Sequence, residues 1–226
     1  MSWGEIKKAI NSTLGTSISK SLDEWLKYRG GDFVFEYESV GTFSLTVPSW
    51  ATIAIITACA GGGGGDYAGY EDHGDYGETV PGIGGAGGTA IYNKIYSVTP
   101  NSTLSITVGK GGTGGRLVAS GTTAAQKGGS TQIGNLVTLV GGNGASTSSA
   151  GTGSGGAGKN GLSGGAYGSK TYYGGGSLGR GGAQNNSGHT MVYPTFGGGG
   201  GAARYRDNGY STGDDGAPGY VKIIFK

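Results

Sequence analysis

Cysteine, proline and charge are all scarce in this chain of 226 residues. The single cysteine, Cys59, excludes an intramolecular disulfide, so the fold must hold together without one. Five prolines, with no glycine repeated at every third position, exclude a collagen-like chain. Charged residues make up only 13%, the net charge is +2, and the Lys and Arg residues are dispersed. This pattern provides no basic patch that would bind nucleic acid or an anionic membrane surface.

Long hydrophobic runs are also lacking. No stretch approaches the roughly 20 apolar residues that a membrane-spanning helix needs. The first residues include Glu5 and two lysines without an apolar core, which is unlike a secretory signal. We therefore expect a soluble protein made without export machinery.

Glycine, by contrast, is very abundant: 55 of the residues are glycine. Five glycines precede Gly61 and none follows Gly219, so 50 of them fall between these two positions. Such a composition is typical of a flexible or disordered segment. Strand-like runs lie within the glycine-rich region and on both sides of it, however, and strands need partners, which favours an ordered structure.

Several short segments have the pattern of β-strands. Alternation over 43–47 predicts a strand that ends at Pro48, and the continuous apolar run 53–59 predicts a strand buried on both faces. Segments 91–98 and 104–108 flank Pro100 and predict a hairpin, and Gly134-Asn135 predicts a second, two-residue hairpin. A β-rich run, 220–225, closes the chain. About seven strands of this kind predict one small β-sandwich with a single core.

The N-terminal residues follow a helical pattern instead. Ser2 and Glu5 have capping-box spacing, ahead of an apolar stripe that contains Trp3, Ile6 and Ile10. Gly15 is expected to end this helix, and a second helix would begin at Thr16 or Ser17 and carry the set Ile18, Leu22, Trp25 and Leu26. Residues 1–30 therefore form either a helix pair packed on the edge of the sandwich or an attachment and oligomerisation segment. We predict the latter, followed by a glycine-rich β-sandwich domain over 31–226.

The glycine runs need a physical role, because ordering so many glycines costs backbone entropy. Extended left-handed helices with three residues per turn provide one, since they form no internal hydrogen bonds and their amides are free to bond sideways. The runs that fit such rods are 61–65, 82–88, 109–115, 151–165, 174–182 and 197–201. The alternative is that these runs are flexible linkers. The predicted fold class is thus all-β, a small β-sandwich whose glycine-rich loops pack as polyglycine II-type helices after a short N-terminal helical segment.

Tyrosine is concentrated between the glycine runs, in company with Asn, Ser, Asp and His. Tyrosine offers a large amphipathic contact at low rotamer cost, which is why binding loops use it so often. The alternative is that these tyrosines merely pack their own loops. Nine of the 14 tyrosines are candidate receptor-binding residues: Tyr67, Tyr70, Tyr76, Tyr167, Tyr172, Tyr173, Tyr193, Tyr205 and Tyr210.

With its glycine-rich islands and Tyr/Asn/Asp loops, the chain resembles the receptor-recognising adhesins at the distal tips of tailed-bacteriophage tail fibres. The segments outside the tyrosine-rich loops are also similar to a wider glycine-rich domain of phage tail proteins. The matching pieces are the residues 47–50 (VPSW), the run 60–65, the residues 97–100 (SVTP) before 104–109, and the terminal 218–221 (PGYV). The opening residues 3–12 are similar to the N-termini of tail-fibre proteins from phages of Gram-positive hosts.

The resemblance implies a binding protein of the virion, located at the tail fibre or tail tip after synthesis in the host cytoplasm. Its partners would be a bacterial surface receptor, either a glycan or an outer protein, and other tail-fibre or baseplate proteins. A homotrimer is compatible with such a place. Trp3, Ile6 and Ile10 would serve attachment, and neither a cofactor nor membrane insertion is expected. The alternative function is a structural glycine-rich tail protein without its own receptor.

Motifs for catalysis and metal binding are weak by comparison. Two matches to G-x-S-x-G, at Ser163 and Ser177, are what glycine density alone produces. The acidic loop 66–78 could hold a hard cation, and Glu71 with Asp75 could form the carboxylate pair of a glycan hydrolase. Solvated charges, or charges that face a cationic receptor group, explain the loop equally well. His73 and His189 lack zinc spacing. We predict that the protein is neither an enzyme nor a metalloprotein.

Overall fold

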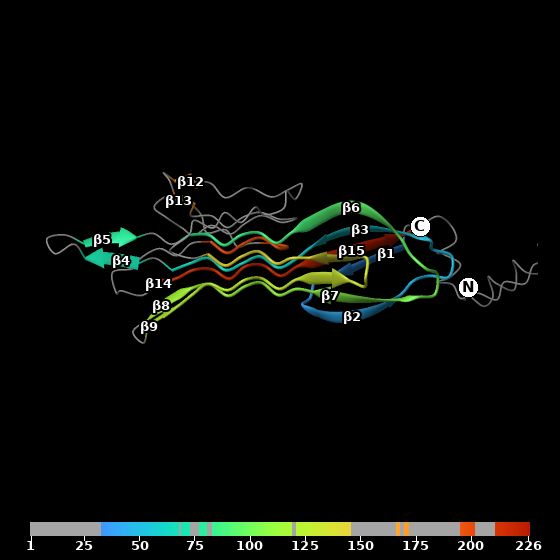
Figure 1. Ribbon diagram of the computed structural model, residues 1–226, viewed down its shortest axis with the longest axis horizontal. Coiled ribbons are helices and arrows are strands. Elements are labelled where there is room, and N and C mark those ends of the chain that lie inside the picture. The colour runs from blue at the N-terminus through green and yellow to red at the C-terminus, as the bar shows by residue number, and fades with distance from the viewer. Residues whose placement is uncertain are drawn as a thin grey trace, which may run out of the picture.

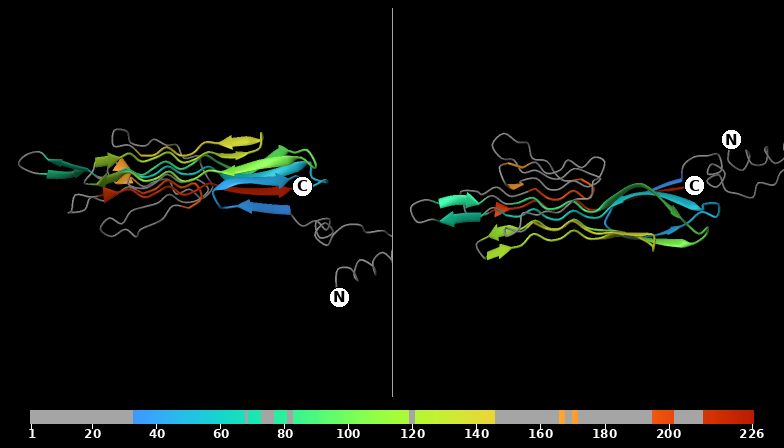
Figure 2. Two further views of the ribbon diagram at one scale, coloured as in Figure 1. Left: turned by 90° about the horizontal axis from the view of Figure 1, so that it is seen from below. Right: turned by 45° about the horizontal axis from the view of Figure 1, so that its top comes forward.

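The computed structural model describes residues 33–67, 69–72, 77–80, 83–118, 121–145, 166–167, 170–171, 195–201 and 211–226. This part of the chain contains strands and no helix, and its sheets are antiparallel, so the fold is all-β. The predicted helical segment 1–30 lies outside the described residues. Figures 1 and 2 show three parts in order along the long axis: two four-stranded sheets, a bundle of glycine-rich segments, and short hairpins at the far end.

Fifteen strands make up the described sheets. They are β1 (Phe33–Tyr37), β2 (Gly41–Thr46), β3 (Ile53–Cys59), β4 (Gly69–Asp72), β5 (Gly77–Val80), β6 (Ala90–Ser97), β7 (Thr103–Val108), β8 (Arg116–Val118), β9 (Gly121–Thr123), β10 (Thr131–Ile133), β11 (Val137–Leu139), β12 (Ala166–Tyr167), β13 (Lys170–Thr171), β14 (Ser211–Thr212) and β15 (Tyr220–Phe225). One large sheet has the order β1-β15-β3-β6, and the other has the order β11-β10-β7-β2.

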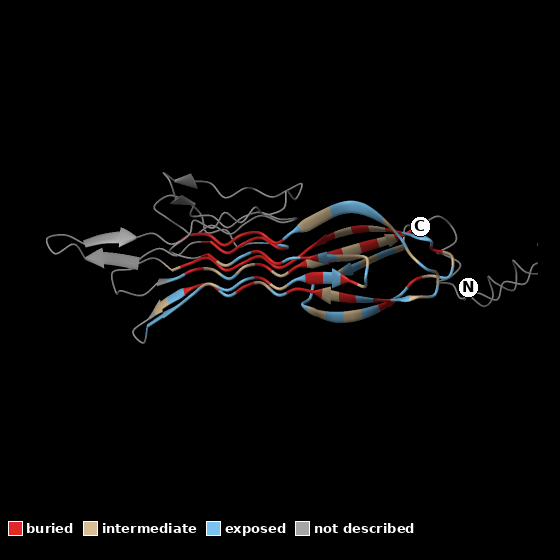
Figure 3. Ribbon diagram, viewed as in Figure 1, coloured by how far each residue is buried: buried red, intermediate tan, exposed pale blue. Residues whose placement is uncertain are grey.

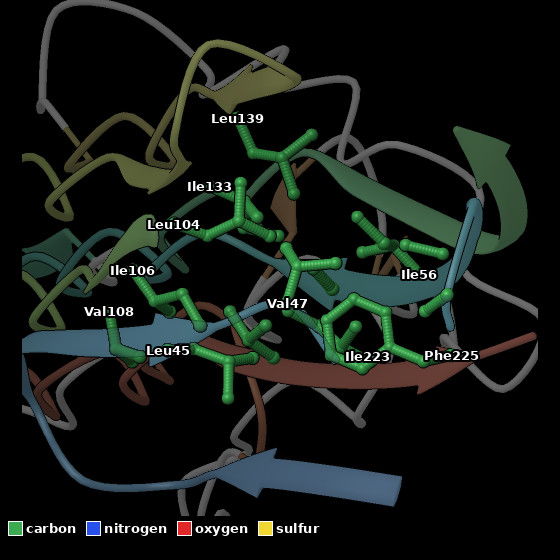
Figure 4. Packing of buried hydrophobic residues seen from close by; sticks show 14 of the residues in the cluster. Leu45, Val47, Ile56, Leu104, Ile106, Val108, Ile133, Leu139, Ile223 and Phe225 are labelled. Atoms are coloured by element: carbon green, nitrogen blue, oxygen red, sulfur yellow. The ribbon is translucent and has the colours of Figure 1, made fainter. Parts of the chain in front are cut away.

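The two large sheets enclose one hydrophobic core (Figure 4). Alternate residues of most of these strands point into it, as expected for strands with one buried face. Ile56 and Phe225 from the first sheet, and Ile106 and Ile133 from the second, are almost completely buried. Trp50 extends this core at its edge, where its ring lies edge-to-face against Phe33 with the ring centroids 5.7 Å apart.

Several predicted strands are confirmed. β3 and β15 have the expected bounds, and β2 precedes Pro48. β3, however, is buried mainly on one face: Ala54 and Ile56 are inaccessible, whereas Ile53 on the other face is 39% exposed. The continuous apolar run therefore reflects a second apolar face rather than a strand buried on both sides.

The predicted hairpin around Pro100 is wrong. β6 pairs with β3 in one sheet, while β7 pairs with β2 and β10 in the other. The turn at Pro100 does form, with the Ser102 amide donating to the Thr99 carbonyl at 3.2 Å, but it carries the chain from one sheet to the facing one. Both arrangements satisfy the same alternating pattern, since each strand needs only one face on the core.

The predicted hairpin at Gly134-Asn135 is confirmed, with a longer loop than expected. β10 and β11 pair as far as Ile133 and Val137, which leaves three residues in the loop. Gly134 has a φ of 48°, a left-handed conformation that glycine adopts without a steric penalty.

The glycine bundle consists of one central segment, 60–66, and six segments around it. Along the central segment the amide of Gly61 donates to the segment 124–130, that of Gly62 to 213–219, and that of Gly63 to 83–89. The next three amides repeat the same order of partners. The donor and acceptor pairs are Gly61–Gly129, Gly62–Ala217, Gly63–Ala86, Gly64–Gln126, Gly65–Asp214 and Asp66–Ile83, at 2.7 to 3.0 Å.

The carbonyls of the central segment accept from the three remaining segments, again with a repeat of three. Gly61 and Gly64 accept from 140–145, Gly62 and Gly65 accept from 109–115, and Gly63 accepts from 197–201. The six outer segments also bond to one another in a closed ring. Around the ring the order is 83–89, 140–145, 124–130, 109–115, 213–219 and 197–201. The centre of the molecule is therefore held by backbone hydrogen bonds rather than by side chains.

Steric contact explains why these segments need glycine. A Cβ atom on Gly63 would lie 2.0 Å from the Asn143 carbonyl oxygen, and one on Gly112 would lie 2.0 Å from that of Gln126. Positions of the outer segments that face solvent carry ordinary side chains, such as the exposed Thr113 and Lys127. Figure 3 shows the same division between a buried centre and exposed outer positions.

The structure describes only some of the glycine runs that the sequence singled out. Runs 61–65, 109–115 and 197–201 lie in the bundle, as does the described part of 82–88, whereas 151–165 and 174–182 fall outside the described residues. Three bundle segments, 124–130, 140–145 and 213–219, were not predicted, because each has only two or three glycines.

We expect the substitution Gly112→Ala to destabilise the protein strongly, whereas Thr113→Ala, at the neighbouring position of the same segment, acts as the matched control. The added methyl group of Gly112→Ala meets a backbone carbonyl that cannot move without breaking the bundle, so the free energy of unfolding should fall by about 3 kcal/mol. Thr113→Ala should change it by about 0.5 kcal/mol or less. Denaturant titration of both variants measures the difference, and equal stabilities would refute this account of the glycines.

Candidate functional site

The path of the chain through the bundle brings several connections to the end that lies away from the large sheets. The central segment and 109–115 lead away from β3 and β7, and 197–201 runs in the same direction, since Gly197 bonds to Pro218 and Asp214 bonds to Gly201. Segments 83–89, 124–130 and 213–219 lead back to the sheets. The described parts of three connections therefore lie at this far end, which we call the loop end: β4 and β5 from 67–82, β8 and β9 from 116–123, and β14 from 202–212.

The first connection contains the hairpin of β4 and β5, which projects beyond the bundle (Figure 1). Its register places Tyr70 opposite Thr79 and Glu71 opposite Glu78. An acidic hairpin is consequently part of the loop end.

The other two connections are joined to each other. β8 pairs with β9 within residues 116–123, and β14 of the third connection adds to the free side of β8. Ser211 lies opposite Leu117 and Thr212 opposite Arg116. These ladders fix two loops of different sequence origin in one three-stranded sheet.

The candidate tyrosines are placed only in part. Tyr67 is half-buried directly after the central segment, and Tyr70 lies in β4, so both belong to the loop end. Tyr167 lies in β12, which pairs with β13. Outside the described residues lie Tyr76, Tyr172, Tyr173, Tyr193, Tyr205 and Tyr210, together with the attachment residues Trp3, Ile6 and Ile10.

Carboxylates close the bundle at its loop end, which sequence reasoning missed. Asp66, the last residue of the central segment, is 2% exposed, and its Oδ1 accepts the Tyr67 amide at 2.9 Å. Asp215 Oδ1 accepts the Gly114 amide at 2.7 Å. Asp66 was predicted as part of an acidic surface loop, but it is a buried component of the bundle. An Asp directly after a glycine run is the signal that could have indicated such a role.

Asp214 is in a less favourable environment. Its Oδ2 is buried without a hydrogen-bond partner. Burial, and to a lesser extent the neighbouring Asp215, raises the pKa of the Asp214 carboxyl above its ordinary value. The negative charge at this position therefore costs folding free energy at neutral pH.

Neither a metal centre nor a membrane span is found in the described parts of the chain. No three His, Cys, Asp or Glu residues come together there in a way that could hold an ion. Within the same residues there is also no helix with the length and apolar character to cross a membrane. Cys59 is buried in β3, next to the start of the bundle.

We expect Asp214→Asn to raise the melting temperature at pH 7, because it removes a poorly solvated charge. A carboxyl whose pKa is raised by folding stabilises the fold below its ordinary pKa of 3.8, and this stabilisation is lost as the pH rises through the folded-state value. The advantage of the variant should therefore disappear at about pH 3, where the wild-type carboxyl is protonated as well. Calorimetry across this pH range tests the prediction, and an advantage that does not depend on pH would contradict it.

Comparison with known proteins gives one match. The search of curated proteins finds no match to this chain. The model of the glycine-rich domain family matches residues 38–226, which include every described strand except β1, all seven described bundle segments and the loop end. Only the first 37 residues fall outside the match. The chain belongs to the glycine-rich domain family.

Proposed function

We propose that the protein is a phage tail-fibre tip adhesin, a receptor-binding protein that recognises a bacterial surface receptor through its Tyr/Asn/Asp-rich loops. The observation that supports this proposal is that β4 with β5, β8 with β9, and β14, which come from three different parts of the sequence, gather at one end of the bundle. Phe33 pairs with Phe225, which is next to Lys226, so these residues lie in the large sheets, at the opposite end from the loop end (Figure 1).

We also infer that the bundle segments are polyglycine II-type helices that extend a small β-sandwich. A repeat of three in the hydrogen-bond partners, with bonds directed only to neighbours, is what a threefold extended helix would produce. Each described segment has five to seven residues, which corresponds to roughly 15–22 Å at about 3.1 Å per residue. Such a bundle would hold its loops well away from the sheets.

The composition of the bundle supports binding by loops. Its centre consists of backbone and its amides are already bonded, so it offers few groups to a ligand. Recognition then depends on the side chains at the loop end and in the remaining connections. Tyrosine rings bury a large area per fixed rotamer and also stack on sugar faces, so a surface glycan and an outer protein are both suitable receptors.

The proposal includes a place in the virion. The loop end would point toward the host, and residues 1–30, which precede the sheets, would attach to another tail-fibre or baseplate protein through Trp3, Ile6 and Ile10. In this function the protein binds and does not catalyse. It needs no cofactor, no nucleic acid and no membrane insertion.

Binding to whole cells tests the role of the tyrosines. We expect Tyr70→Ala, and the double substitutions of Tyr172 with Tyr173 and of Tyr205 with Tyr210, to weaken binding by about 1–3 kcal/mol for each tyrosine removed. Tyr92→Ala is the matched control, because Tyr92 is 53% exposed but lies on β6 at the sheet end. Binding of the purified variants to cells from a panel of bacterial strains, with the melting temperature as a folding control, gives the comparison.

The alternative function has a different outcome in the same experiment. If the protein is a structural tail protein without its own receptor, the purified protein should not bind any of the bacterial strains that the parent virion infects. Its tyrosine variants should still be incorporated into virions normally. If the wild-type protein binds cells, but the loop variants bind them as strongly as Tyr92→Ala does, then the proposal that the loop end recognises the receptor is wrong.

A further inference from the structure

The outer face of the sheet β1-β15-β3-β6 carries a row of aliphatic side chains that crosses all four strands. Val34 lies opposite Ile224, Ile224 opposite Ile55, and Ile55 opposite Ile95. Directly paired residues of antiparallel strands point to the same face. The flanking residues Phe35, Ile223, Ala54 and Tyr96 belong to the core or pack against it, so this row lies on the opposite face.

The row is exposed at its two ends and half-buried at Ile55 and Ile224. Ile95 is 66% exposed and Val34 is 44% exposed, and Ile53, two residues before Ile55 on β3 and on the same face, is 39% exposed. These are three of the seven large exposed hydrophobic residues in the described part of the chain. Figure 3 shows β6, which contributes Ile95, as a largely exposed strand. We call Val34, Ile53, Ile55, Ile95 and Ile224 the outer apolar row.

Polar contacts border the row on the side of the bundle. Lys222 Nζ lies 2.7 Å from Glu36 Oε1, and Thr57 Oγ1 donates to Asn93 Oδ1 at 3.0 Å. The apolar surface is therefore a narrow strip across the sheet. With strands about 4.8 Å apart, four strands give a strip roughly 14 Å long.

We propose that residues 16–30 of the same chain cover the outer apolar row as an amphipathic helix. This segment lies outside the described residues, and its sequence predicts an apolar stripe of Ile18, Leu22, Trp25 and Leu26. From Ile18 to Leu26 such a stripe is about 12 Å long at 1.5 Å per residue, which matches the length of the row. A helix laid across the four strands would bury both apolar surfaces.

The connection to β1 makes this contact favourable. Six residues, 27–32, separate Leu26 from Phe33, and they can span up to about 20 Å. Val34 is the second residue of β1 and forms one end of the row. The segment is thus held close to its docking surface, which makes the contact effectively intramolecular.

A second copy of the chain fits the row less well. Five aliphatic side chains bury only a few hundred Å², whereas stable association needs about 800 Å² from each partner. The edge strand β6 is also irregular, since its pairing with β3 shifts between Ile56 and Ala58 and Asn93 has a φ of 46°. Irregular edges with charged residues such as Lys94 disfavour pairing between molecules.

The inference separates two roles in the N-terminal residues and goes beyond the proposed function. The stripe of 16–30 would belong to the fold, while Trp3, Ile6 and Ile10 would remain available for attachment. Neither statement depends on the loop end or on the identity of a receptor.

Limited trypsin digestion of the full chain tests the proposal. Lys20, Lys27 and Arg29 lie in the covered segment, and Lys7 and Lys8 lie before it and act as internal references. We expect cleavage at Lys20 and Lys27 to be at least about 10-fold slower than at Lys7, because a docked helix must open before it is cut. Ile95→Glu, on the sheet, and Trp25→Ala, on the segment, should each remove this protection.

Val140→Glu is the matched control, because it places the same charge at another exposed aliphatic residue, which is 49% exposed and outside the row. It should leave the protection unchanged. The proposal is wrong if wild-type Lys20 and Lys27 are cut as fast as Lys7, or if Ile95→Glu has no effect. Sedimentation analysis of the same proteins tests whether a second copy of the chain covers the row instead. If the wild-type protein is an oligomer that Ile95→Glu dissociates, the row binds a second copy and the proposal is wrong.

Discussion

The close approach of backbones in the glycine bundle is the constraint on which the rest of the structure depends. Seven described segments pack so tightly that a Cβ atom at an inward position would overlap a neighbouring carbonyl, as at Gly63 and Asn143. In return, the amides and carbonyls of the central segment find partners in six surrounding segments. Buried backbone groups must be paired, and this arrangement pairs them without a sheet and with almost no side-chain core.

The large sheets organise this bundle, because six of its seven described segments continue strands. β15, β3 and β6 lead into or out of 213–219, 60–66 and 83–89, and β7, β10 and β11 do the same for 109–115, 124–130 and 140–145. β3 lies between β15 and β6, and the second sheet faces it across the core. The segment 60–66, which continues β3, is therefore surrounded on most sides by the continuations of the other strands, and 197–201 completes the ring around it. The hydrophobic core thus fixes the position of each bundle segment through the strand to which it is joined.

The two ends of the molecule then have different chemistry. At the sheet end, aliphatic and aromatic side chains determine stability, and Tyr220 illustrates the polar boundary, where burial and the charge of Glu36 raise its pKa to about 12. At the loop end, carboxylates such as Asp66 and Asp215 bond to amides where the bundle stops. Asp214 departs from this pattern, because its buried Oδ2 has no hydrogen-bond partner.

The sequence by itself determined the local elements. The strand bounds of β3 and β15 follow from apolar runs, the hairpin of β10 and β11 follows from Gly134-Asn135, and the longest glycine runs mark much of the bundle. β1 was missed despite its alternation of aromatic residues with Val34 and Glu36, a pattern of the kind that predicted β2. Among the candidate site residues, Tyr67 directly follows the central segment and Tyr70 lies in β4, and nothing local showed that β4 shares an end of the molecule with β8, β9 and β14.

Only the tertiary structure decided the rest. β6 and β7 were free to pair with each other or to lie in facing sheets, because either choice buries one face of each strand. Segments 124–130, 140–145 and 213–219 joined the bundle although they contain few glycines, because an outer segment needs glycine only at the positions that face its neighbours. Asp66 is buried because it belongs to the central segment, which the other segments surround. Which positions face inward is set by contacts between residues far apart in the sequence, and no local pattern records those contacts.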